Sequence, residues 1–102
     1  MERFGNDNYT DIINNTRTFV LDFSASWCGP CRKVEPVLEE LSDKYPDLPF
    51  YKCDVGEEQQ AAAHFNIYSV PTIIFFRDGQ EMNRISGVRT QQFLEDEIQK
   101  LL

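Results

Sequence analysis

The chain has 102 residues, and its 17 Asp and Glu against 10 Lys and Arg give a formal net charge of −7. This length predicts a single domain over residues 1–102. The hydrophobic fraction of 41% is enough for one core and argues against intrinsic disorder. The acidic balance argues against nucleic acid and anionic membranes as partners, because both carry negative charge themselves.

Membrane and secretory signals are missing from the sequence. No run approaches the roughly 20 apolar residues that span a bilayer. The N-terminal residues lack the basic and apolar regions of a secretory signal, so we expect a cytoplasmic protein. Three cysteines are also too few for a disulfide scaffold.

Strand and helix patterns alternate along the chain. A brief strand near Arg3 and a short helix around residues 9–13 are expected first. Runs rich in β-forming residues predict strands at residues 18–24, 50–55, 72–76 and 82–86. Helical spacing of apolar residues predicts helices at residues 31–45 and 58–65, and a last helix that Thr90 caps and whose apolar positions are Phe93, Leu94, Ile98 and Leu101.

Two turn signals fix how these elements connect. Asn66 is expected to end the second helix in the left-handed backbone conformation. Asp78-Gly79 predicts a tight hairpin between the last two strands. A strand–helix–strand unit favours a parallel pair of strands, and the hairpin adds antiparallel ones. The sequence therefore predicts an α/β fold, with a mixed sheet of four to five strands and helices on both faces.

A Cys-x-x-Cys motif, Cys28 to Cys31, lies where the first long strand gives way to a helix. The free N–H groups and the positive dipole of a helix N-terminus stabilise a thiolate at Cys28. Cys31 lies one turn further on, points inward and receives less of this stabilisation. The motif thus predicts an exposed nucleophile and a buried resolving thiol, while Gly29 and Pro30 form a stiff loop between them.

Other interpretations of the motif are weaker. A zinc site needs four ligands, usually from two separated pairs, and only Cys53 and His64 are left to supply the second pair. A purely structural disulfide would close a very short loop and stabilise the fold little. Redox chemistry is the leading interpretation.

Asp22 stands in the middle of an otherwise apolar strand. Burial disfavours its charged form, so we expect a raised pKa and a bound proton near neutral pH. Lys52, in the middle of the neighbouring strand, is the candidate partner. The alternative is a tolerated Asp with no chemical role. Cys53 is expected to be a small buried residue, with a regulatory thiol as the alternative.

The run from Asp22 to Cys31, with its Trp-Cys-Gly-Pro-Cys core, is followed by Val70-Pro71-Thr72, Asp78-Gly79 and Ser86-Gly87. This pattern closely resembles the thioredoxin family from about Thr18 onward. The resemblance implies the thioredoxin fold, with Cys28 as the attacking thiol and Cys31 as the resolving one. It also implies that Asp22 accepts the resolving proton, and Lys52 matches the basic residue near that acid in some family members.

A client-docking surface is also implied by the resemblance. Pro71 matches the family's cis-proline beside the dithiol, although spacing alone does not distinguish cis from trans. The backbone of Val70 would pair with an incoming peptide. Trp27, Gly87 and Val88 would line the apolar surface around it. Because Gly56 stands where the family often has Asp, Asp54 or Glu57 is expected to bond the Trp27 indole.

The function that the resemblance implies is reduction of client disulfides by thiol–disulfide exchange. No cofactor is expected in this chain, because NADPH and FAD belong to a separate thioredoxin reductase that recycles it. Clients such as peroxiredoxins or reductases are expected, with the chain as a monomer. Three alternatives stay open: a disulfide oxidase or isomerase with a more oxidising pair, a non-catalytic binding module, and a form in which a metal bridges two chains.

Overall fold

The computed structural model describes all 102 residues. Every expected helix and strand is present. The elements in chain order are β1 (Glu2–Arg3), α1 (Tyr9–Asn15), β2 (Thr18–Ser24), α2 (Gly29–Lys44), β3 (Phe50–Asp54), α3 (Gln59–His64), β4 (Thr72–Arg77), β5 (Gln80–Ser86) and α4 (Gln91–Leu101). Two elements begin two residues earlier than expected: α2, because Cys28 itself is the N-cap, and β5, because its strand starts directly after the Asp78-Gly79 turn.

The strands form one mixed five-stranded sheet in the order β1-β3-β2-β4-β5. The two pairings of β3, with β1 and with β2, are parallel. The two pairings of β4, with β2 and with β5, are antiparallel. The predicted fold class is therefore confirmed, and β2, which leads to the Cys-x-x-Cys motif, is the central strand.

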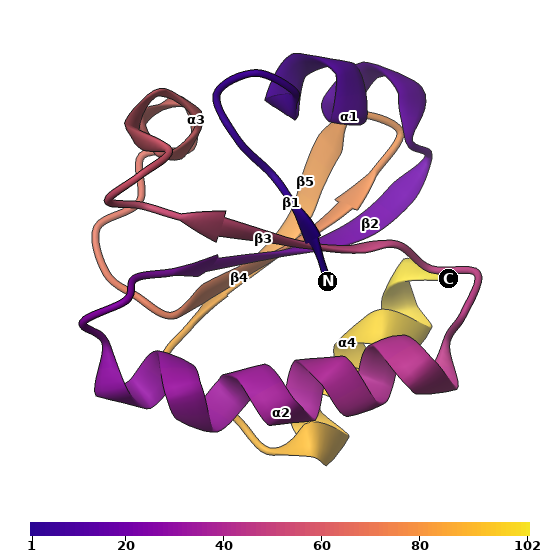
Figure 1. Ribbon diagram of the computed structural model, residues 1–102. Helices are drawn as coiled ribbons and strands as arrows, with labels where there is room; N and C mark the ends of the chain where they lie inside the picture. Colours follow the sequence, from indigo (N-terminus) through magenta and orange to yellow (C-terminus); the bar gives the residue numbers. More distant parts are fainter.

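Helices cover both faces of the sheet (Figure 1). Alternate residues of β2 point to opposite faces, as strand geometry requires. Val20 packs with the aliphatic side chains of α2 and α4. Phe19, Leu21 and Phe23 pack on the other face, in an aromatic-rich layer closed by α1 and α3. Each face thus has its own buried layer, and β2 contributes to both.

The turn residues behave as predicted. Asn66 has φ 53°, and Asp78 and Gly79 have φ 53° and 76°, the left-handed conformations that a helix stop and a two-residue hairpin need. The Thr90 hydroxyl caps α4 by accepting the Phe93 N–H at 3.1 Å. Of the apolar positions of α4, Leu94, Ile98 and Leu101 are buried, whereas Phe93 is 41% exposed. None of the helices has the length and apolar character needed to cross a membrane.

Candidate active site

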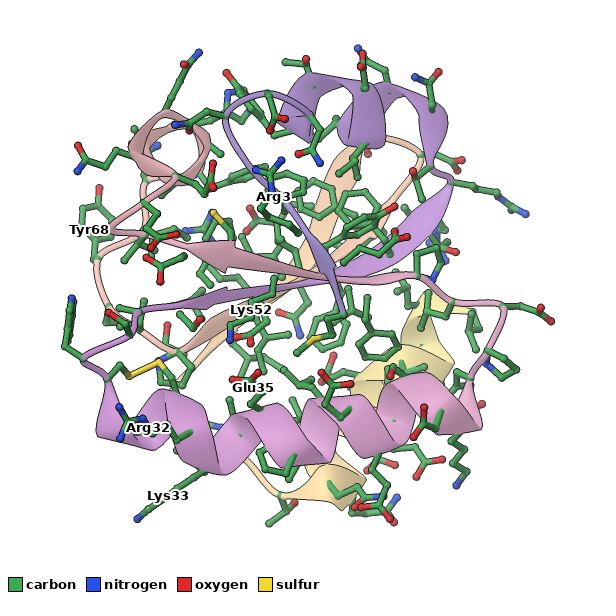
Figure 2. The ribbon with its side chains drawn as sticks, viewed as in Figure 1. Arg3, Arg32, Lys33, Glu35, Lys52 and Tyr68 are labelled. Atoms are coloured by element: carbon green, nitrogen blue, oxygen red, sulfur yellow. A yellow bond between two sulfur atoms is a disulfide. The ribbon has the colours of Figure 1, made fainter.

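The dithiol lies at the junction between the central strand and the longest helix. Cys28 and Cys31 form a disulfide whose Cα atoms are 5.4 Å apart. Figure 2 shows this bond at the start of α2, next to the end of the sheet. Cys28 is the N-cap residue, and its Sγ accepts the Cys31 N–H at 3.1 Å. Gly29 and Pro30 form the first turn, and the Cys31 N–H at the start of the helix points at the sulfur atom that the sequence predicted to react.

Both cysteines are buried in the disulfide form. Cys28 is only 4% exposed and Cys31 3% exposed, in a small cluster with Ala25. The expectation of an exposed Cys28 is therefore wrong for this state. The reason is that Val70, in a loop far away in sequence, packs over the cluster, with its carbonyl oxygen 3.8 Å from Cys28 Sγ.

The predicted docking residues gather around the disulfide. The Val70–Pro71 peptide bond is cis, as the resemblance implied. The Gly87 N–H donates to the Pro71 carbonyl oxygen at 2.9 Å, which ties the loop before α4 to the loop before β4. Trp27 and Val88 complete the surface and are 75% and 44% exposed. Segments from three parts of the chain thus form one apolar surface beside the sulfur atoms.

The prediction for the Trp27 indole is wrong. Its N–H forms no hydrogen bond with either proposed residue. The Asp54 carboxylate instead accepts the backbone N–H groups of Gly56 and Glu57, at 2.8 and 3.1 Å. These bonds are local to the turn after β3, so they hold Asp54 back toward its own backbone.

The carboxylate oxygens of Asp22 are the only fully buried side-chain polar atoms left without a hydrogen bond. Asp22 is 1% exposed, and neither carboxylate oxygen has a partner. Burial raises the pKa of Asp22 to about 7, because the charged form loses its hydration there. The sequence therefore predicted both the burial and the direction of the pKa shift correctly.

The predicted partner of Asp22 is bonded to a different carboxylate. Lys52 lies directly across from Asp22 in the pairing of β2 with β3. Its ammonium group, however, donates to both oxygens of Glu35 in α2, at 3.0 and 2.9 Å. Figure 2 shows Lys52 and Glu35 pointing toward each other. Lys52 and Glu35 are both about a third exposed, so both charged groups stay partly hydrated. An ion pair between Lys52 and buried Asp22 would lose that hydration.

Glu35 was not singled out from the sequence. It lies four residues after Cys31, one helical turn along the same side of α2, which is the signal that could have identified it. The charges of Lys52 and Glu35 act on Asp22 in opposite directions. Lys52 lowers the pKa of Asp22 and Glu35 raises it, while burial is the largest cause. Lys52 is thus an electrostatic neighbour of Asp22 and not its hydrogen-bond partner.

Known proteins with this sequence pattern and fold identify the family. The family model described as Thioredoxin matches residues 1–100. Thioredoxin H2 of Arabidopsis thaliana is 40% identical over 93 residues, which are 91% of this chain and 69% of that protein. The X-ray structure of Fasciola hepatica thioredoxin has a TM-score of 0.90 and 34% identity, with all of both chains covered. The chain belongs to the thioredoxin family.

A further solved structure is similar. It was determined in work on the thiol-resolving mechanism of a yeast mitochondrial 1-Cys peroxiredoxin via glutathione/thioredoxin systems. It has a TM-score of 0.89 and 32% identity, and the match covers 98% of this chain and 94% of that one. Thioredoxins are protein-disulfide oxidoreductases that work through a Cys-x-x-Cys pair and need no cofactor, so this chain is an enzyme of that type.

A hollow of about 490 Å³ beside the dithiol was not predicted. It is mostly apolar and lies between α3 and the loop that leads to Pro71, with Trp27, Val55 and Val70 in its lining. Tyr68, which is 93% exposed, is also among its lining residues. The apolar pair Ile67-Tyr68 in an otherwise polar loop is the sequence signal for this hollow.

Cys53, the third cysteine, lies on the opposite face of the sheet from Asp22. It is fully buried in the aromatic-rich layer, which confirms the expected burial. Burial, reinforced by the nearby carboxylates of Glu58, Asp54 and Asp22, raises the pKa of Cys53 to about 12. A thiol in this environment is not ionised at neutral pH. No group of three or more His, Cys, Asp or Glu side chains gathers to form a metal site.

Proposed function

We propose that this thioredoxin works as a reductase of client disulfides, with Cys28 as the attacking thiolate. The observation that carries this assignment is the position of Cys28 Sγ at the N-cap of α2, where it accepts the Cys31 N–H. A sulfur atom held there is stabilised as an anion, and the thiolate is the nucleophile in disulfide exchange. Gly29 and Pro30 keep the two sulfur atoms within one turn, so the second step is intramolecular.

The reaction has two exchange steps. The Cys28 thiolate attacks one sulfur of the client disulfide, which breaks that bond, forms a mixed disulfide and releases one client thiolate. Cys31 then loses its proton and attacks Cys28 Sγ, which forms the Cys28–Cys31 disulfide and releases the second client thiolate. Two electrons pass from the protein to the client, and the two client thiolates take up protons.

Asp22 is proposed as the acceptor of the Cys31 proton, through an intervening water molecule. A general base works best when its pKa lies near the working pH, and burial brings the pKa of Asp22 to about 7. The carboxylate lies on the α2 side of β2. Neither of its oxygens has a hydrogen bond that would have to break before it accepts a proton. Lys52 contributes through its charge, as described above.

Clients are proposed to dock along the surface around the disulfide. The backbone of Val70 would pair with an extended client segment as a short added strand. Pro71 would shape that segment's path, and Trp27, Gly87 and Val88 would pack against it. The apolar character and exposure of Trp27 and Val88 support this assignment.

For partners, we infer a thioredoxin reductase that carries FAD and uses NADPH, because the reaction leaves this chain oxidised. Peroxiredoxins and reductases with an active-site disulfide are the proposed clients. Support for a peroxiredoxin comes from the similar yeast structure described above. We propose that residues 1–102 act as a single domain, as a monomer and in the cytoplasm.

Trapping of mixed disulfides tests the two cysteine roles. In the Cys31→Ser variant the second step cannot occur, so clients should stay covalently bound to Cys28 and be released by dithiothreitol. The matched control is the double variant Cys28→Ser, Cys31→Ser, in which only buried Cys53 is left and no adduct should form. Adducts that survive in the double variant would overturn the assignment of Cys28 as the nucleophile.

A further inference from the structure

Cations without a carboxylate partner are concentrated near the active site. The chain has ten Lys and Arg residues. Six of them form ion pairs with carboxylates, namely Arg3, Arg17, Lys44, Lys52, Arg84 and Lys100. The other four are Arg32, Lys33, Arg77 and Arg89. All of these except Arg77 lie in the two segments that adjoin the disulfide and the cis-proline.

Arg32 and Lys33 directly follow Cys31 on α2. Both side chains are exposed, and Figure 2 shows them at the end of α2 where the disulfide lies. Arg32 Nη2 donates to the carbonyl oxygen of Ser26 at 3.1 Å, which holds the guanidinium against the loop before Trp27. Because that partner is neutral, the positive charge of Arg32 is not compensated.

Arg89 directly follows the docking residues Gly87 and Val88. Its guanidinium donates to the Val88 carbonyl oxygen at 3.3 Å and lies 5.6 Å from the centre of the Phe93 ring. A cation over an aromatic face is attracted by the ring and keeps its charge. This contact gives a role to the exposed ring of Phe93. It holds Arg89 beside Gly87, whose N–H is bonded to Pro71.

The side of the site toward β3 and α3 carries the opposite charge. Asp54, Glu57 and Glu58 lie in the turn between these elements, next to Val55 and Gln59, which line the hollow. Positive charge that has no carboxylate partner therefore lies only on the α2 and α4 side of the disulfide, whereas Arg3 and Lys52 are paired with Glu58 and Glu35. Charges arranged in this way favour a partner whose charges are opposite in sign at the corresponding positions, and they increase its rate of association.

We propose that Arg32, Lys33 and Arg89 form a cationic rim that selects client segments with Asp or Glu next to their disulfide. The inference rests on the proposed function, since it names the class of client that the same site reduces best. An acidic protein segment fits better than nucleic acid. A uniformly charged polyanion would be repelled by the carboxylates of the turn after β3 and by the net charge of −7. The carboxylates would lie along α2 and α4, and the apolar hollow would take the client's uncharged side chains.

Matched peptides test this inference in single turnover, without any reductase. Three peptides each contain one intramolecular disulfide and differ only in the flanking residues, which are Asp, Asn or Lys. Reduced wild-type protein is mixed with each one, and the second-order rate constant of dithiol oxidation is measured. We expect the Asp peptide to react about tenfold faster than the Lys peptide at low ionic strength, with the Asn peptide between them. The difference should shrink strongly at about 0.5 M salt, where the Debye length is only a few ångströms.

Charge-reversal variants test which residues cause the preference for the Asp peptide. In the double variant Arg32→Glu, Arg89→Glu, the order of the Asp and Lys peptides should invert. The control is Arg17→Glu, which removes an exposed cation at the opposite end of β2 and should leave the order unchanged. Circular dichroism confirms that the variants are folded.

The outcomes separate the two proposals. Wild-type protein that reduces none of the peptides contradicts the proposed function, whereas equal rates for all of them contradict only the cationic rim. A control variant that changes the order as much as the double variant does would show that net charge, not the rim, selects clients. Double-stranded DNA and a linear Asp peptide can each be added as competitors of the Asp disulfide peptide. If the DNA slows its reduction more strongly than the linear peptide does, the inference is overturned, because the rim would then favour nucleic acid.

Discussion

The two faces of the central strand bury very different side chains. On the face that meets α1 and α3, Phe19 packs among other rings, stacked on Phe76 at 4.7 Å between ring centroids and edge-on to Tyr51 at 5.6 Å. On the face that meets α2, Asp22 is buried just as deeply, and neither of its oxygens is bonded. Only two residues of the strand, Val20 and Leu21, lie between a well-packed aromatic side chain and an unpartnered carboxyl group.

This difference separates the source of stability from the source of reactivity. A buried aromatic ring stabilises the fold through apolar area and dispersion. A buried carboxyl group destabilises the charged state, and its pKa moves toward the pH at which the protein works. The departures from good packing rules are thus confined to the α2 face, next to the dithiol.

Truncation on the aromatic face should have the largest effect on stability. Phe19 is fully buried, so Phe19→Ala should lower the free energy of unfolding by about 3–5 kcal/mol. Denaturant unfolding at several pH values measures this. The difference in stability between pH 5 and pH 8 should stay the same as in the wild type. A change in that difference would show that the two faces are coupled.

Replacement of Asp22 should have the opposite sign. The folded chain holds the Asp22 proton up to a pH of about 7, whereas the unfolded chain releases it near its ordinary pKa of about 3.9. Because the folded state binds the proton more tightly, wild-type stability falls as the pH rises from about 4 to about 7. Asp22→Asn should remove this fall and increase stability at pH 8 by on the order of 4 kcal/mol, with little change at pH 4.

The same variant separates stability from catalysis. Stability at pH 4 and pH 8 is measured by denaturant unfolding, alongside the rate of disulfide reduction. Asp22→Asn should slow reduction even though the protein is more stable, because the proton acceptor is missing. An unchanged rate would remove Asp22 from the mechanism. A stability difference between Asp22→Asn and the wild type that is the same at pH 4 and pH 8 would contradict the raised pKa.

Removal of the Glu35 charge should have the smallest effect. Glu35 raises the pKa of Asp22, so Glu35→Gln should lower that pKa, and only slightly, because Glu35 is partly exposed and is the smallest of the causes. Carboxyl-carbon NMR titration of Asp22 measures the shift directly. Lys52→Met is the matched control and should move the pKa upward, since Lys52 lowers it. Shifts of the same sign in both variants would contradict opposite roles for the ion pair.

Local patterns predicted most of the fold and part of the site. Strand alternation, the Asp78-Gly79 hairpin and the Thr90 cap depend on neighbouring residues, and the structure confirms them. The burial of Asp22 was also predictable, because a strand that is apolar on both faces is covered on both faces, and a carboxyl group in its middle is then covered too. The cis bond before Pro71 was expected only from the family resemblance.

The remaining details depend on how distant segments pack. Lys52 bonds Glu35 because α2 presents that carboxylate above β3, a placement that neither segment specifies alone. Cys28 is buried by Val70, which lies 42 residues away in the chain. The exposure of Phe93 depends on where the interface of α4 ends, which helical spacing does not specify.

The redox potential of the Cys28–Cys31 pair tests the central claim most directly. Equilibrium titration against dithiothreitol measures it, with the fraction of disulfide followed by thiol alkylation and mass spectrometry. A thioredoxin that reduces clients should have a potential close to the family's characteristic value of about −270 mV. A potential above about −200 mV would contradict the account, because such a pair would oxidise or isomerise client disulfides rather than reduce them.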